Sequence, residues 1–137
     1  MALYRCGGGG TPISTTLWTN SSPTSSTTGI VANLSQGLSN FDYVAFKFRI
    51  STTNSTQQIG GMMSIADFIA TAGSDYPGTR SFIGYASSSS LLYVRSIRYS
   101  SNTQVLIGNA FKVITSGTPG TTPTQVIPLE VIGIKIA

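Results

Sequence analysis

The chain has 137 residues, of which 40% are hydrophobic and only 9% are charged, with a formal net charge of +4. This length and hydrophobic content fit one domain that folds without a metal or a disulfide, and they exclude intrinsic disorder, which combines low hydrophobicity with high net charge. The single cysteine excludes an intramolecular disulfide, and the eight basic residues form no continuous stripe, so we expect no nucleic-acid partner.

Residues 1–16 are predicted to form an extended N-terminal arm ahead of a domain over 17–137. Four consecutive glycines cannot hold a regular element, and Thr11-Pro12 follows where a phosphate-binding loop needs Gly-Lys-Ser/Thr. No secretory signal and no membrane span are expected, because no apolar run is long enough. We expect the arm to anchor the domain to a partner through Tyr4, Arg5, Cys6, Gly7, Gly8, Gly9 and Gly10.

The first half of the chain predicts three strands, over 17–19, 27–34 and 41–50. The third has the clearest pattern, because apolar and polar residues alternate from Tyr43 to Ile50. Apolar residues at every second position are typical of an antiparallel strand with one solvated face. Val44, Phe46, Phe48 and Ile50 are therefore predicted to face the core.

The segment 59–72 fits either a strand or one helical turn, for which Ser64 is a candidate N-cap. Further strands are predicted over 80–86, 91–99, 103–114 and 125–136. Both faces of 91–99 are partly apolar, which suits a central strand or a subunit contact. Pro128 within the last strand indicates either an edge position or a bulge.

About eight short strands, with turn residues every 8–12 positions, predict an all-β fold. The spacing is typical of an antiparallel β-sandwich of the jelly-roll or Greek-key type. No long helical pattern and no internal repeat interrupts it.

Catalytic chemistry has few candidates in this sequence. The absence of histidine removes the usual general base and every Ser-His-Asp triad, and one thiol without imidazoles does not close a zinc site. The four carboxylates are Asp42, Asp67, Asp75 and Glu130, and glycoside hydrolysis would need two of them to face each other. We expect no enzyme activity, no metal and no cofactor.

Aromatic and basic side chains on neighbouring predicted strands are the candidates for ligand binding. Tyrosine and tryptophan combine rigid apolar area with a polar tip, which suits a sugar-binding platform, although the same residues also fill cores. The candidate residues are Trp18, Tyr85, Tyr93, Arg95, Arg98 and Tyr99.

Several segments together resemble a known class of module. They are Leu17-Trp18-Thr19-Asn20-Ser-Ser-Pro23, Leu38-Ser39-Asn40-Phe41-Asp42-Tyr43, Arg95-Ser-Ile97-Arg98-Tyr99 and the closing Ile127-Pro128-Leu129-Glu130-Val131-Ile132-Gly133-Ile134. Over about residues 17–135 the chain resembles β-sandwich modules of tailed-bacteriophage virion proteins, which include tail-fibre, baseplate-associated, head-fibre and decoration proteins. The resemblance implies a homotrimer built into a virion together with other virion proteins.

We therefore expect a structural part of a tailed-phage virion, made in the host cytoplasm. A tail-side fibre or baseplate module that recognises a host-surface glycan is the first hypothesis. A capsid decoration or head-fibre protein is the second, and a free carbohydrate-binding module is the third.

Overall fold

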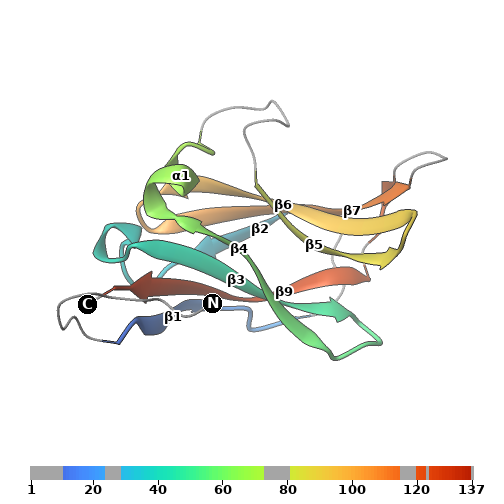
Figure 1. The fold of residues 1–137 in the computed structure, drawn as a ribbon, viewed down its shortest axis with the longest axis horizontal. Helices are drawn as coiled ribbons and strands as arrows, with labels where there is room; N and C mark the ends of the chain where they lie inside the picture. The colour runs from blue at the N-terminus through green and yellow to red at the C-terminus, as the bar shows by residue number, and fades with distance from the viewer. Residues whose placement is uncertain (1–10, 24–28, 73–80, 115–119, 123, 137) are drawn as a thin grey trace.

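A computed structural model describes residues 11–23, 29–72, 81–114, 120–122 and 124–136. The described chain forms two antiparallel sheets that pack face to face, with a short helix at one end (Figure 1). The predicted all-β sandwich is confirmed.

Sheet A contains four of the described strands. Their order across the sheet is β1 (Ile13–Thr19), β9 (Gln125–Lys135), β3 (Tyr43–Ser51) and β4 (Gln57–Ser64). The first and last of the long strands thus lie side by side, with Ile13 opposite Lys135. The polar segment 51–58 contains the turn that connects β3 to β4 in this hairpin.

Sheet B has the order β2 (Ile30–Asn33), β7 (Gln104–Ile114), β6 (Leu91–Ser101) and β5 (Ser81–Ser88), and β8 (Gly120–Thr121) also pairs with β7. Strands β5, β6 and β7 form a meander of two hairpins. The chain crosses between the sheets before and after this meander, so that each sheet is built from segments far apart in sequence.

The core lies between the two sheets, and its sheet A half follows the predicted alternation. Val44, Phe46 and Phe48 are each at most 1% exposed, and they pack with residues such as Ile83 and Ile97 of sheet B. Burying a side chain of this size stabilises the fold by about 1.5–3 kcal/mol. The faces assigned to β3 from sequence are therefore correct for these three residues, whereas Ile50 at the end of the strand is only partly buried.

The ambiguous segment 59–72 contains both of the predicted alternatives in succession. Strand β4 ends at Ser64, and a single helical turn, α1 (Ile65–Ile69), follows it. The Ser64 Oγ accepts a hydrogen bond from the Asp67 backbone N–H at 3.1 Å, as a capping residue does. Phe68 of this turn is fully buried and closes that end of the core.

Gly61 shows why β4 carries glycine beside the core. Its φ is +63°, which side chains other than glycine rarely adopt. A Cβ at this position would lie 3.0 Å from Ile83 Cγ2 and 3.1 Å from Phe46 Cδ2. The two sheets can approach here only because the side chain is missing.

Two details of the ends and edges differ from the sequence prediction. Strand β1 begins at Ile13, so residues 13–16, which were predicted to belong to the arm, pair with β9 instead. Their Ser/Thr-rich composition obscured a strand that pairs with β9 through its backbone, and Thr16 Oγ1 also donates to the Glu130 carboxylate of β9. Pro128 lies in a strand flanked on both sides, so the edge alternative is wrong, and a register irregularity at Phe48–Pro128 agrees with the bulge.

Candidate binding cleft at the hairpin end

The β3–β4 hairpin, the β5–β6 hairpin and the start of β9 lie at the end of the sandwich opposite α1 (Figure 1). Residues of these three segments line a polar cleft. Its volume is about 560 Å³. We call it the tyrosine cleft, and it is lined by Ile50, Ser51, Thr53, Asn54, Thr56, Gln58, Tyr85, Ala86, Ser87, Tyr93 and Gln125.

Tyr85 and Tyr93 form the aromatic part of the cleft. They lie directly opposite each other on β5 and β6, with ring centroids 5.4 Å apart and planes tilted by 37°. Both rings are partly buried against the core. Because the sheet fixes their backbones and the core fixes their inner edges, the two rings present a preformed apolar surface at low entropic cost.

The Tyr85 hydroxyl is tied to β9. It donates a hydrogen bond to Gln125 Oε1, which bridges the two sheets at the cleft. Burial raises the pKa of Tyr85, and the neighbouring Tyr93 raises it further, so the hydroxyl stays protonated and remains a donor at neutral pH. The bond also leaves the Gln125 amide N–H groups able to donate to a ligand.

The opposite wall of the cleft is a loop that is shaped by its own polar side chains. Ser51 Oγ accepts from the backbone N–H groups of Thr53 and Asn54, and Asn54 Oδ1 accepts from the N–H of Thr56. Such side-chain to backbone bonds replace a sheet ladder where the chain turns. Gln58, just beyond the loop, is exposed on β4.

The chemistry of the lining limits what the cleft can hold. No residue that lines it carries a charge, among the residues that the structure describes. Hydroxyl and amide groups beside aromatic rings suit a neutral ligand that is rich in hydroxyl groups and has apolar faces, as a sugar does.

The structure brings together two of the six predicted ligand residues, Tyr85 and Tyr93. Trp18 is half-buried on β1 and packs against the core. Tyr99 lies at the α1 end, where its ring meets Phe68 edge-on at a centroid distance of 5.9 Å. Its backbone N–H donates to Thr71 Oγ1 at 2.9 Å. For these two residues the core alternative describes the structure better than a shared platform.

Arg95 is the clearest correction among the predicted site residues. It was expected on a binding surface, but it is fully buried between the sheets. Its Nε donates to the Val126 carbonyl at 2.7 Å and its Nη1 to the Gly108 carbonyl at 2.9 Å. Burial lowers the pKa of Arg95 to about 10, so the guanidinium is still charged at neutral pH.

Arg95 stabilises a strained part of the backbone, because the carbonyl that accepts its Nε hydrogen bond belongs to Val126 of β9. Val126 has φ +50°, a conformation that costs a branched residue roughly 1–3 kcal/mol. The bond from Arg95 links this residue of sheet A to β6 of sheet B. The guanidinium therefore fastens the two sheets at a point where the backbone is distorted.

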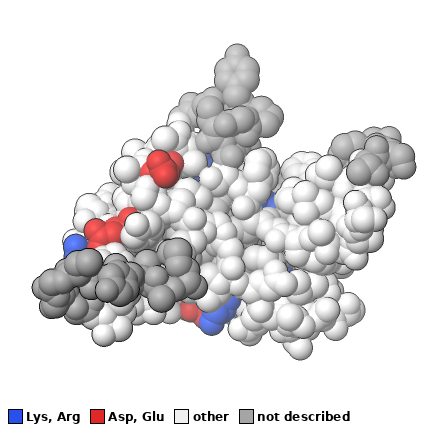
Figure 2. Space-filling view, viewed as in Figure 1, with Lys and Arg blue, Asp and Glu red and all other residues white. Residues whose placement is uncertain are grey.

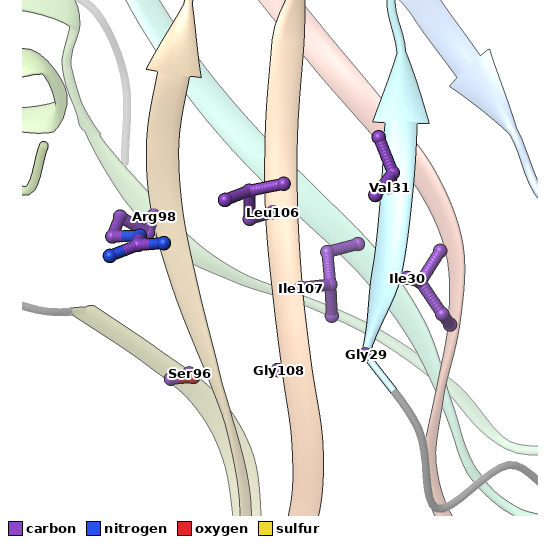
Figure 3. Close-up of a pocket in the computed structure, with 8 residues that line it drawn as sticks. All are labelled: Gly29, Ile30, Val31, Ser96, Arg98, Leu106, Ile107 and Gly108. Carbon is purple, nitrogen blue, oxygen red and sulfur yellow. The ribbon is translucent and has the colours of Figure 1, made fainter. Parts of the chain in front are cut away.

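Arg98 faces away from both the core and the cleft. It lies on the outer face of sheet B, beside Leu106 and across from Val31, where it lines a shallow hollow (Figure 3). Arg95 and Arg98 are three residues apart on β6, so their side chains lie on opposite faces of sheet B. The predicted docking residues Tyr4 to Gly10 lie outside the described residues.

Sequence reasoning missed the polar wall of the cleft. Residues 51–58 are polar and follow the strand predicted over 41–50, but nothing local shows that this segment lies opposite Tyr85. The signal that could have found it is the unusual run of Ser, Thr, Asn and Gln side chains, all of them hydrogen-bonding groups, between two strands of one hairpin.

Comparisons with known proteins found no relative of this chain. No protein-family model matches it, and no curated protein and no solved structure matches it significantly. Within the described ranges, no group of three or more Cys, Asp or Glu side chains is placed to hold a metal ion. None of the helices in those ranges is long and apolar enough to cross a membrane.

Proposed function

We propose that the chain is a structural module of a tailed-phage virion, placed on the tail side, and that it binds a neutral glycan of the host surface in the tyrosine cleft. The observation that carries the glycan part is the pairing of the Tyr85–Tyr93 surface with an uncharged wall of hydroxyl and amide groups. The virion part is supported by the sequence resemblance and by the low charge of the sandwich. Few charged side chains are visible on the face shown in Figure 2.

A capsid decoration or head-fibre protein is the second candidate. It is favoured by the exposed apolar side chains on sheet B, since a part that coats a particle needs a docking surface but no sugar site. A free carbohydrate-binding module would use the same cleft but would not be found in particles. Glycan binding and presence in the virion therefore separate the three hypotheses.

The glycan test uses the labelled full-length chain on an array of neutral and acidic bacterial and host-type glycans. We expect binding to neutral glycans, and we expect Tyr93→Ala to weaken it at least 30-fold, as loss of a central aromatic contact does. Gln58→Ala should weaken it about fivefold, the worth of one hydrogen bond. Gln57→Ala is the matched control, because the same side chain one residue earlier does not line the cleft.

Absence of binding to any glycan would reject the glycan part of the proposal. Binding that survives both Tyr93→Ala and Gln58→Ala would reject the tyrosine cleft as its site. The virion part is tested separately, by mass spectrometry of density-gradient-purified phage particles from the host that carries the gene. Absence of the chain from those particles would reject it.

A further inference from the structure

The outer face of sheet B is unusually apolar for a surface. Five large hydrophobic side chains on it are between 39% and 52% exposed, and they come from four strands of the sheet: Val31 from β2, Phe82 from β5, Leu92 from β6, and Phe111 and Val113 from β7. Scattered apolar residues are normal on a surface, whereas a contiguous group of this kind marks an interaction site.

The strand register shows that the group is contiguous. Reading across β5, β6 and β7, Ala86, Leu92 and Val113 form one row, and the next row is Gly84, Val94 and Phe111. A third row begins at Phe82 opposite Ser96. A fourth runs from Arg98 through Leu106 to Val31. Neighbouring rows lie two residues apart along a strand, so their side chains share one face.

Two hollows lie within this face. The first, of about 280 Å³, is bounded by Arg98, Leu106 and Val31 and contains the small residues Gly29, Ser96 and Gly108 (Figure 3). A Cβ at Gly108 would collide with Ser96 Oγ, so glycine keeps this hollow open. The second, of about 330 Å³ and mostly apolar, lies at the β5–β6 turn beside Leu92 and Val113. Each is larger than the roughly 150 Å³ that accepts a benzene ring.

The exposed area matches what one side of a stable protein interface supplies. Side chains of this size expose roughly 150–200 Å² each when free, so the five together expose roughly 400 Å². A standard interface buries roughly 800 Å² per partner, of which about 56% is apolar, or roughly 450 Å². The face also offers both parts of a contact with itself. Phe82 lies opposite Ser96, which lines the first hollow, and Phe111 lies two residues from Val113, which lines the second.

We propose that the outer face of sheet B binds the same face of a second copy of this chain. In the pair, the two sheets stack about 10 Å apart, and the phenylalanines of each copy enter the hollows of the other. A contact of one face with itself closes after two copies, so it yields a dimer. This inference goes beyond the proposed function and does not rest on it, and it puts a dimer in place of the homotrimer that the resemblance implies.

The test is the solution mass of the full-length chain by light scattering after gel filtration, over a range of concentrations from about 1 µM to 500 µM. We expect a mass of twice 14.4 kDa at the upper end. Phe111→Ser should raise the dissociation constant at least tenfold while circular dichroism still shows a folded sandwich, because Phe111 is 42% exposed in the single chain. Ile59→Ser is the matched control: it removes an exposed hydrophobic residue (62%) from sheet A and should change nothing.

A chain that stays monomeric at 500 µM would overturn the inference and leave a different protein as the occupant of the face. A dimer that Phe111→Ser and Phe82→Ser both leave intact, or that Ile59→Ser weakens equally, would overturn the choice of face. A mass of three chains would overturn the two-fold arrangement. Glycan binding is read separately, so failure of either proposal is recognisable without the other.

Discussion

The outer face of sheet A and the outer face of sheet B differ in where each sheet keeps its charges. Sheet A carries charge outside: Lys47 Nζ lies 3.2 Å from Glu130 Oε2, and Thr16 Oγ1 donates to the same carboxylate at 2.9 Å. Sheet B holds one arginine inside, Arg95, and carries Arg98 on an outer face that is otherwise mainly apolar. Strands of sheet A also expose hydrophobic side chains, Ile13, Ile59 and Met62, so the two sheets differ in the charge of their outer faces and not in exposed apolar residues alone.

The ion pair of Lys47 and Glu130 lies on the sheet that contains β1 and β9, and the face that we propose as a dimer contact lies mainly on the meander of β5, β6 and β7. The tyrosine cleft lies between them at one end, with lining residues from both sheets.

The largest effect is expected from a charge placed on the buried side of sheet A. Phe46→Asp should unfold the chain, because Phe46 is 1% exposed and an unpaired buried carboxylate costs several kcal/mol. Urea denaturation followed by circular dichroism measures it. A variant as stable as the parent would show that the inner and outer faces of sheet A are assigned the wrong way round.

A smaller effect is expected from removing the buried charge of sheet B. Arg95→Ala should lower the free energy of unfolding by about 3–5 kcal/mol, because it opens a cavity and leaves the Val126 and Gly108 carbonyls without their donor. Arg98→Ala is the matched control on the same strand and should cost less than about 1 kcal/mol. Equal losses in the two variants would contradict the structural role of Arg95.

The smallest effect is expected at the ion pair outside sheet A. The hydrogen bond from Thr16, together with Lys47, holds the pKa of Glu130 below its usual value. A lowered folded-state pKa means that this stabilisation is present above about pH 4.5 and is lost as the pH falls through the lowered value. Glu130→Gln should therefore cost at most about 1 kcal/mol at pH 7, and less at low pH.

That pH dependence is measured by thermal unfolding of parent and variant between pH 2.5 and pH 7, at low and at high salt. The gap between the two should narrow on acidification and on addition of salt. A gap that is independent of pH would assign the effect of Glu130 to packing and leave the outer face of sheet A without an electrostatic role.

The sequence predicted most of the fold but little of the cleft, for a physical reason. Alternation at period two reports which side of a strand is buried, and it placed Val44, Phe46 and Phe48 correctly. Alternation also puts Arg95 on the same side as Tyr93 and Ile97, which was the overlooked sign of its burial. The Arg95 guanidinium donates to Val126 of β9, which is 31 residues further along the chain. A local sequence pattern does not indicate contacts between residues so far apart.

The pairing of β1 with β9 has a consequence for how the module responds to pulling. Ile13 and Lys135 are neighbours at the same end of an antiparallel ladder. A load applied between them acts across the strands, so it opens the backbone bonds one after another, as a zip does, instead of shearing them together. Tension at these two points would peel β1 from the edge of sheet A at low force. A load between Ile13 and the β5–β6 turn would instead have to separate the two sheets and break the buried hydrogen bond from Arg95 to Val126.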